Sequence, residues 1–468
     1  MAKGSRRLVC GFLLLPLLYA ALLRCNISPP LRLWKLQLLP HNWPQSLSVT
    51  ISNDTVPERT DQFTRFILRR LVRGSARRQL SRDGVACISD PESDICVTTG
   101  PVRISTGASP TAVYLTGNQR LPLETPDASV RVRPYARKTD RVAMSRTSPV
   151  AILPGPPDPP QCDVDHSVPA VVFSTGGFAG NFFHDINDVL IPLFLTTADL
   201  HSRVQLVVTD YEGYWVRKYR RVLSRLSGHD IVVASSSSSA AEARVHCFPA
   251  AVVGLKYHGN LLCNSTSPPG GISTADFRNF IRSSLSLDAA PAAARELPVL
   301  VLLSRKKSRM LLNEEEVVGL AESVGFRVVV ATAEAMRDVQ EFAEAVNGCD
   351  VLMGVHGAGM TNMVFLRAGA VLLQVVPWGL DWAAAAYYGR PARRMGLQYV
   401  EYHIGVEESS LYEQYPKDDP VLVDPWGVNL KGYNVSKPVY TDGQNVRLDL
   451  SRFRETLLNA RKLIPTKL

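Results

Sequence analysis

The stretch VLMGVHGAGMTNMVF, residues 351–365, indicates the fold of this chain. Its first five residues are apolar and predict a buried strand, and Gly357, Ala358 and Gly359 then form a turn that leads into the start of a helix. The apolar run GAVLLQVVP follows directly and predicts the next strand. A strand–helix–strand unit of this kind is typical of a parallel α/β sheet.

The small residues of this turn leave backbone N–H groups uncovered at a helix start, which suits a bound phosphate. The spacing Gly354-x-x-Gly357-x-Gly359 is not the dinucleotide fingerprint, and the sequence contains no P-loop motif. Two interpretations remain, a tightly packed glycine turn and a phosphate site. His356 favours the phosphate site, because a buried His needs a hydrogen-bond partner and a phosphate supplies one.

Length and composition limit the function classes. A chain of 468 residues is too long for one core and predicts two domains with extensions. Much of the net charge of +9 lies before residue 150, in runs such as RRLVRGSARRQLSR. No zinc-finger spacing or aromatic–basic interleaving accompanies these runs, so nucleic-acid binding is not indicated. The sequence has no C-x-x-C, which argues against thiol redox chemistry and zinc.

The N-terminus carries a membrane signal. Lys3, Arg6 and Arg7 precede the apolar run 8–23. This run is short for a membrane span, so a cleaved signal peptide is the alternative, but no A-x-A site follows. We therefore expect a cytosolic tail at 1–7, a single-pass type II signal anchor at 8–23, a stem at 24–84 and a lumenal body. A short span suits the thinner membranes of the early secretory route.

Sequons and cysteines agree with a lumenal body. N-glycosylation sequons predict glycans at three positions: Asn53, Asn264 and Asn434. Six cysteines lie in the body, and an even number in an oxidising lumen favours disulfides. The short loop between Cys87 and Cys96 is the first choice for a bridge, whereas Cys349 is either paired or a buried thiol.

Strands alternate with helices in two halves, residues 85–287 and 297–468, around the hinge-like sequence LDAAPAAARELP. The polar segment that ends near residue 160 is predicted to be a connecting loop. Two Rossmann-like domains that face a cleft form the GT-B architecture when the donor is a nucleotide sugar. We therefore expect a GT-B fold, with the acceptor on the N-terminal side and the nucleotide sugar on the C-terminal side.

Five ordered segments are distinctive: GNFFHDINDVLIPLF, VVGLKYHGNLL, SRKKSRMLLNEEEVV, DVLMGVHGAGMTNMVFLRAGAVLLQVVP and EYHIGVEESSLYEQYPKDDPVL. Together, over residues 85–468, they resemble glycosyltransferase family 61, most closely its grass-expanded clade that decorates xylan. The resemblance implies an inverting, Golgi-resident transferase that moves arabinofuranose or xylose from a UDP-sugar to xylan side-chain positions. The alternatives are xylosyl or N-acetylglucosaminyl transfer to a glycoprotein, and a catalytically silent, anchored glycan-binding homologue.

Inverting sugar transfer needs groups that stabilise the departing diphosphate. Arg305 and Arg309 follow the predicted strand PVLVLLS, and arginine suits bidentate phosphate binding. Because strand carboxyl ends line the ligand site of open α/β sheets, these arginines and the glycine turn are expected to meet. The alternative is a solvated basic turn. The predicted donor site comprises Arg305, Arg309, His356, Gly357, Ala358, Gly359, Thr361 and Asn362.

The transfer also needs a base that takes the proton of the acceptor hydroxyl. His184 and Asp185 follow a glycine loop, and either is a candidate, since His titrates near neutral pH and an adjacent carboxylate can orient it. The alternative is a helix start at which Asp185 and Asp188 face the helix dipole. Further candidates for acceptor or donor contacts are Asn181, Lys256, His258, Glu401 and Glu407; each glutamate could instead cap a helix.

A metal is not required by this pattern. The motif Asp163-Val-Asp165 has the Asp-x-Asp spacing of a metal site, but it follows a proline-rich loop and is weak support for one. We expect no obligatory metal or cofactor beyond the UDP-sugar co-substrate. The expected partners are a xylan-type glycan, the Golgi membrane and other Golgi transferases. A dinucleotide oxidoreductase does not fit, because the fingerprint is missing and the N-terminal signals are lumenal.

Overall fold

The computed structural model describes residues 56–121, 129–156, 158–236, 242–287 and 296–465. The chain divides into two units, Met1–Val56 and Pro57–Leu468, and the fold below belongs to the second. The expected tail, anchor, first part of the stem and glycan at Asn53 lie outside the described residues. None of the helices in the described ranges has the length and apolar character needed to cross a bilayer.

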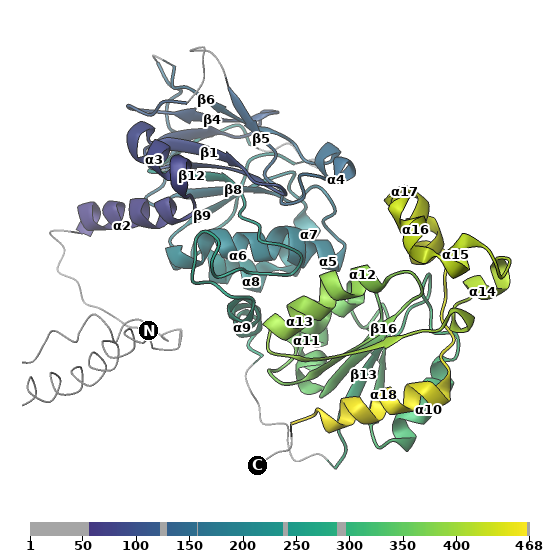
Figure 1. The fold of residues 1–468 in the computed structure, drawn as a ribbon. Coiled ribbons are helices and arrows are strands. Elements are labelled where there is room, and N and C mark those ends of the chain that lie inside the picture. The colour runs from purple at the N-terminus through teal and green to yellow at the C-terminus, as the bar shows by residue number, and fades with distance from the viewer. Residues whose placement is uncertain (1–55, 122–128, 157, 237–241, 288–295, 466–468) are drawn as a thin grey trace, which may run out of the picture. The chain divides into compact units, whose positions relative to one another are not determined.

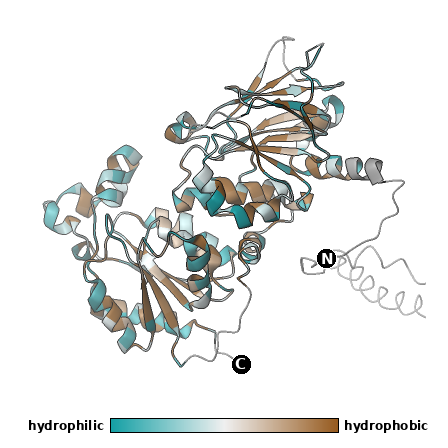
Figure 2. Cartoon of the chain, turned by 180° about the vertical axis from the view of Figure 1, so that it is seen from behind, coloured by the Kyte–Doolittle hydropathy of each residue, from teal (hydrophilic) through white to brown (hydrophobic). Residues whose placement is uncertain are grey.

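The C-terminal half contains a parallel sheet of five strands (Figure 1). In spatial order the strands are β14 (Arg327–Ala331), β13 (Val299–Leu303), β15 (Val351–Val355), β16 (Val371–Val376) and β17 (Gln398–His403). The three central strands β13, β15 and β16 are buried along their whole length, whereas the edge strands β14 and β17 are partly exposed. Figure 2 shows hydrophobic residues concentrated in this sheet. Burial on both faces explains why the sequences of the central strands are nearly continuous apolar runs.

Helices cover both faces of this sheet. Alternate strand residues pack against α10 (Glu314–Ser323) and α18 (Leu450–Lys462) on one face, and those between them face α11 (Val339–Gly348) on the other. The remaining elements of this half are η4 (Ala358–Phe365), α12 (Asp381–Ala384), η5 (Ala385–Gly389), α13 (Arg390–Arg394), η6 (Val406–Glu408), α14 (Leu411–Gln414), α15 (Pro420–Val423), α16 (Pro425–Leu430), α17 (Tyr433–Ser436) and η7 (Lys437–Asp442). The half is therefore a doubly wound α/β fold, as the sequence predicted.

The strand order contains one topological switch. The chain passes from β13 to β14 on one side and then crosses to β15 on the other side of β13. The loops that leave β13 and β15 consequently turn in opposite directions. In open α/β sheets, ligands bind outside the strand carboxyl ends at this point.

The N-terminal half has two mixed sheets that pack against each other across an apolar core. The first has the order β1 (Val85–Ser89), β2 (Asp94–Thr98), β12 (Ala251–Gly254), β8 (Ala170–Ser174), β9 (Gln205–Thr209) and β10 (Val232–Val233). The second has the order β5 (Val130–Val132), β6 (Val150–Leu153), β4 (Thr111–Leu115), β3 (Val102–Ser105), β11 (Val245–Phe248) and β7 (Val164–Asp165). In the first sheet the part from β12 to β10 is parallel, and in the second the parallel pairs are β4 with β6 and β11 with β7. The Rossmann-like pattern is therefore partial in this half.

The prediction of a connecting loop up to residue 160 is wrong, because the segment contains β4, β5 and β6. In β4, as in β3, buried and half-exposed residues alternate, so half of each strand is free to be polar. The sequence VHCFPAAVVGL supplies β11 and β12 to different sheets. A short strand with one face partly open to solvent carries too few apolar residues for composition to reveal it.

Helices cover the outer face of the first mixed sheet. They are α2 (Val56–Arg70), α3 (Gly74–Asp83), α6 (Ile191–Thr197), α7 (Gly213–Lys218), α8 (Arg220–Leu226) and α9 (Thr274–Ser284), with the short α4 (Arg141–Ser145), α5 (Phe182–His184), η2 (Asp185–Leu190) and η3 (Ala198–Leu200). Residues 56–83 were assigned to the stem, but Leu68, Leu71 and Leu80 are buried in this core. The many arginines of α2 and α3 lie on the outer side and conceal the apolar side in the sequence.

Two disulfides lie in the N-terminal half. Cys87 and Cys96, the pair selected from the sequence, face each other on β1 and β2 and are bonded. The second bridge joins Cys162 to Cys247, which the sequence did not indicate. Cys263 and Cys349 are buried free thiols. Burial raises the pKa of the Cys349 thiol to about 12, so the group is inert.

Candidate active site

The switch point of the parallel sheet brings together two segments that the sequence singled out. Arg305 and Arg309 follow β13, and His356 and Gly357 follow β15. Nη1 of Arg309 donates a hydrogen bond to the backbone oxygen of His356 over 3.0 Å. The guanidinium of Arg305 lies against Gly357, where any Cβ would overlap its Nη1 atom. The predicted meeting of the basic turn and the glycine turn is thus present in the structure.

The two arginines lack negative partners. Nε of Arg305 donates to the backbone oxygen of Ser308 over 2.8 Å, and Nε of Arg309 is buried with no partner. Across the described ranges, neither arginine forms an ion pair with a carboxylate. Burial, followed by the charge of Arg305, lowers the pKa of Arg309 to about 10. Two half-buried cations without compensation form an environment that a diphosphate would relieve.

His356 is held in one neutral tautomer. Burial, and then the charges of Arg309 and Arg305, lower its pKa to about 3. The Tyr399 hydroxyl donates to Oε1 of Gln374 over 2.9 Å, and Nε2 of Gln374 donates to Nδ1 of His356 over 2.7 Å. The imidazole proton therefore resides on Nε2, where it is a hydrogen-bond donor.

The turn after β15 differs in detail from the sequence-based prediction. The segment η4 is a 3-10 helix and not an α-helix. Nδ2 of Asn362 donates to the backbone oxygen of Gly359 over 2.8 Å, a local bond that competes with the regular helix pattern. Thr361 and Asn362 are both buried, so their side chains do not fit the predicted donor contacts. Backbone N–H groups at Gly357, Ala358 and Gly359 are the remaining candidates in this turn.

A second cluster lies on η2, a π-helix in the N-terminal half. Nδ1 of His184 lies 2.8 Å from Oδ2 of Asp188, one helical turn away, and 18% of the His184 side chain is exposed. Asp188 is fully buried and also accepts from the hydroxyl of Tyr135 over 2.8 Å. An ionised carboxylate can only accept, so Nδ1 carries a proton and the lone pair of Nε2 is free to receive one.

The carboxylate of Asp185 is closed to a substrate. Its Oδ1 accepts from the backbone N–H of Gly180 and from Trp215 Nε1, at 2.7 Å and 2.9 Å. Its Oδ2 accepts from the hydroxyl of Tyr219 and from Lys218 Nζ, at 2.7 Å and 3.2 Å. The prediction that Asp185 could be the base does not fit this geometry, because every favourable acceptor position is occupied. Asp188, named only as a helix-dipole residue from the sequence, is the acid that orients His184.

Aromatic rings connect the two clusters. Phe183 contacts the rings of Tyr387 and Tyr388 edge to face, with centroids 5.4 Å and 6.5 Å away. The hydroxyl of Tyr388 donates to the backbone oxygen of Gly357 over 2.8 Å, and its ring lies 5.3 Å from that of His356. The side chain next to His184 thus packs directly on residues that support the basic turn. Sequence reasoning missed Tyr387 and Tyr388, which follow the predicted strands at no distinctive spacing.

The other predicted contact residues have local partners. Asn181 caps α5 by accepting from the backbone N–H of Phe183 over 3.1 Å. Nζ of Lys256 is 2.5 Å from a carboxylate oxygen of Asp90. Both ring nitrogens of His258 are hydrogen-bonded, to the backbone oxygen of Pro268 and the backbone N–H of Asn264. These bonds do not favour a substrate role for Lys256 or His258.

The C-terminal motif divides into an exposed part and a structural part. Glu401 and Glu407 are exposed, and Oε1 of Glu401 is 3.3 Å from Nε2 of His403. Glu408, which the sequence did not select, is buried and accepts from the Tyr402 hydroxyl and two backbone N–H groups. Glu408 therefore anchors this segment to the sheet. The exposed sequon residues Asn264 and Asn434 remain predicted glycosylation sites.

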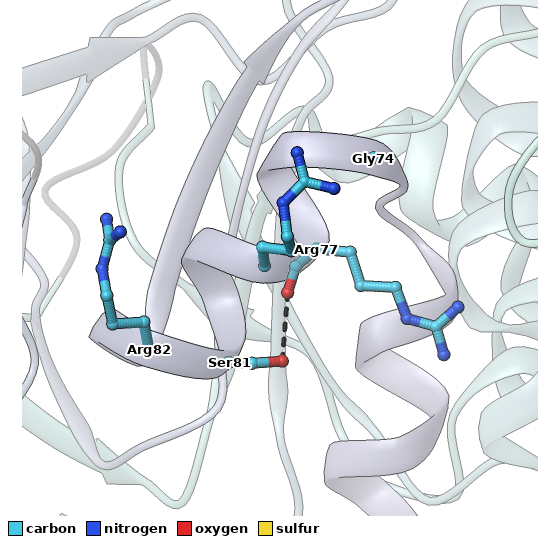
Figure 3. A pocket seen from close by; sticks show the side chains of 5 residues that line it. Gly74, Arg77, Ser81 and Arg82 are labelled. Atoms are coloured by element: carbon cyan, nitrogen blue, oxygen red, sulfur yellow. Dashed lines mark hydrogen bonds between the residues drawn. The ribbon is translucent and has the colours of Figure 1, made fainter.

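Two other features are distinct from this site. A surface hollow of about 570 Å³ on α3 is lined by Gly74, Arg77, Arg78, Ser81 and Arg82 (Figure 3). It contains no acid, the hydroxyl of Ser81 donates to the backbone oxygen of Arg77, and the arginines extend from the helix in different directions.

In the described ranges, the group with metal-ligand spacing is Cys162, Asp165 and Cys247. Both of these cysteines are in a disulfide, so they offer no thiolate, and the absence of an obligatory metal stays a prediction.

Comparison with known proteins agrees with the geometry. The xylan glycosyltransferase MUCI21 of Arabidopsis thaliana is 36% identical over 392 residues, which cover 79% of this chain and 77% of that protein. The β-1,2-xylosyltransferase XYXT1 of Oryza sativa subsp. japonica is 36% identical over 393 residues, covering 80% and 83%. The chain belongs to glycosyltransferase family 61.

The family 61 profile matches residues 182–373, a range that contains both His184 and the turn after β15. The α-1,3-arabinosyltransferase XAT3 of Oryza sativa subsp. japonica is 39% identical over 379 residues, 80% of this chain. The matched region spans 64% of that arabinosyltransferase, slightly less than two thirds of its length. The family is thus established, and the relatives differ in the pentose that their names specify.

Proposed function

We propose that this member of family 61 is an inverting glycosyltransferase that moves a pentose, arabinofuranose or xylose, from a UDP-sugar to side-chain positions of xylan. The observation that carries the proposal is the pair Arg305 and Arg309, two half-buried cations without a carboxylate at the switch point of a parallel sheet. The named activities of the related arabinosyl- and xylosyltransferases support the pentose and the xylan acceptor.

In this proposal the donor diphosphate lies between the two arginines and the turn after β15. Both guanidiniums stabilise the negative charge that develops on the leaving group, which is the main electrostatic requirement of the reaction. The Nε2–H of His356 and the backbone N–H groups of the Gly357 turn add neutral donors. No metal is needed for this charge balance, since two cations face one diphosphate.

His184 is the proposed base. Asp188 accepts from Nδ1, so Nε2 takes the proton of the acceptor hydroxyl as that oxygen attacks the anomeric carbon. Phe178 lies beside the imidazole, with ring centroids 4.7 Å apart, and limits its rotation. The roles of the two halves follow: the N-terminal half activates the acceptor and the C-terminal half binds the donor, as in a GT-B enzyme. A type II Golgi anchor at residues 8–23 and a lumenal body complete the proposal.

Calorimetry with UDP, followed by a screen of UDP-sugars on xylo-oligosaccharides, tests this function. We expect UDP to bind and a UDP-pentose to be transferred with inversion. UDP binding without turnover on any donor and acceptor would instead indicate a silent glycan-binding homologue. Exclusive use of a UDP-hexosamine on a glycopeptide would overturn the xylan assignment.

A further inference from the structure

The segment from α15 to α17 exposes large apolar side chains. Val423, Trp426, Leu430 and Tyr433 are 63%, 61%, 69% and 61% exposed. Trp426 and Leu430 lie one turn apart on α16, Val423 ends α15 and Tyr433 begins α17. Single exposed apolar residues are common on soluble proteins, but two aromatic rings and two aliphatic side chains within eleven residues mark an interaction surface. We call these four residues the aromatic platform.

The opposite side of the same segment is fixed to the sheet. Val421, Leu422 and Val428 are buried with Leu380 in a small core. Nδ2 of Asn429 donates to the backbone oxygen of Gly379 over 2.8 Å. The loop that contains Leu380 and Gly379 follows β16, so the platform is mounted beside the strand ends that form the proposed donor site. Its residues are therefore presented on a rigid support.

The platform lies beside the proposed active site. Asn429 of α16 donates to the backbone oxygen of Gly379, three residues before Trp382. Trp382, 40% exposed, contacts Tyr387 edge to face with centroids 6.0 Å apart. Tyr387 in turn lies 6.3 Å from His356. A row of exposed rings thus leads away from the donor site.

The charge around the platform selects the kind of ligand. The acidic residues between positions 418 and 442 are Asp418, Asp419, Asp424 and Asp442, and the basic ones are Lys431 and Lys437, of which Lys437 pairs with Asp442. This slightly acidic surface suits neither an anionic lipid surface nor a polyanion. An uncharged ligand with flat apolar faces fits aromatic rings in a mildly acidic setting.

We propose that the aromatic platform binds the sugar rings of an uncharged chain of β-linked pentopyranoses, and so holds the acceptor polysaccharide several residues away from the reacting hydroxyl. A pentopyranose has no exocyclic hydroxymethyl group, so its C–H faces can lie flat on Trp426 and Tyr433. The inference rests on the proposed function, because it names an additional subsite for the same acceptor.

Binding of xylohexaose and xylobiose to the full chain in detergent tests the platform by calorimetry. We expect Trp426→Ala and Tyr433→Ala each to weaken xylohexaose binding about tenfold, with xylobiose and UDP binding unchanged. Trp426→Phe should restore most of the loss, because a ring is retained. Phe66→Ala is the matched control, since Phe66 is an exposed ring on α2, 55% accessible. Both alanine variants preserve the sequon at Asn434.

Equal xylohexaose affinity of Trp426→Ala and the unchanged chain overturns the inference. Loss of self-association in sedimentation experiments, with oligosaccharide binding intact, would assign the platform to a second copy of the chain instead. Loss of flotation with uncharged phosphatidylcholine vesicles would assign it to a membrane. If the unchanged chain binds UDP but no xylo-oligosaccharide of any length, the xylan acceptor of the proposed function fails, a result distinct from a failure of the platform alone.

Discussion

The two clusters of the candidate active site manage charge in opposite ways. Around η2 the carboxylates of Asp185 and Asp188 are fully buried, and each has several hydrogen-bond donors. At the switch point, neither Arg305 nor Arg309 forms an ion pair with an acid among the described residues, and Nε of Arg309 has no partner. A satisfied network holds its members in place, whereas an uncompensated charge is costly until a ligand arrives. In the proposed function the first cluster is therefore mainly a scaffold that presents Nε2 of His184, and the second cluster binds the donor.

The largest expected effect concerns Nε2 of His184, the proposed proton acceptor in the cluster on η2. His184→Ala should lower turnover by about 10²–10⁴-fold with UDP affinity unchanged, because the base is lost while the donor site is intact. Asp188→Asn should cost less, since the ring that accepts the proton is still present. Steady-state kinetics with the correct acceptor, together with UDP calorimetry, measure both effects. Near-native turnover of His184→Ala would place the base elsewhere.

The next effect is a loss of folding stability, which we expect when a buried carboxylate of the η2 cluster is removed. Asp185→Ala leaves Lys218, Trp215 and Tyr219 without their shared acceptor, and should lower the free energy of unfolding by about 3–5 kcal/mol. Asp230→Ala, at an exposed position, is the control and should change little. Urea unfolding measures the difference. If the Asp185→Ala variant is as stable as the unchanged chain but has lost turnover, Asp185 is a catalytic residue and not a structural one.

For Arg305 and Arg309 we expect the reverse: substitution should weaken UDP binding and leave folding stability unchanged. Arg305→Met and Arg309→Met should each cost about 1.5–3 kcal/mol in UDP binding, roughly tenfold or more in affinity. Their unfolding free energy should not fall, because burial already disfavours both charges in the folded chain. Lys307→Met, in the same turn but exposed, serves as the control. A sharp loss of thermal stability with unchanged UDP affinity would show that these arginines are structural.

The last effect, which is small for each single pH unit, is a dependence of stability on pH. The pKa of His356 is about 3 in the folded chain and near 6.5 when unfolded, so the unfolded chain takes up a proton that the folded chain excludes. His356 should therefore reduce stability as pH falls from about 6.5 towards 3, by at most about 1.4 kcal/mol per pH unit. His356→Asn should remove this part of the slope. An unchanged slope in urea titrations at several pH values would contradict the buried, neutral imidazole.

The sequence by itself determined the parallel sheet of the C-terminal half and the position of the glycine turn after β15. Strands buried on both faces are continuous apolar runs, and the caps and glycines that end them are local signals. Arg305, Arg309 and Gly357 could be selected because a strand end fixes where the next few residues lie. The second sheet of the N-terminal half was missed, since strands such as Thr111–Leu115 alternate in burial and have polar neighbours.

Only the tertiary structure decided which acid serves His184. Asp185 and Asp188 are equivalent in the sequence, and their roles differ because Trp215 and Tyr219 surround one while Tyr135 and the imidazole reach the other. The tautomer of His356 likewise depends on Gln374 and Tyr399 from neighbouring strands. Hydrogen-bond partners that are far apart in the chain form no motif in the sequence. Which ring nitrogen carries the proton is therefore set by the folded structure.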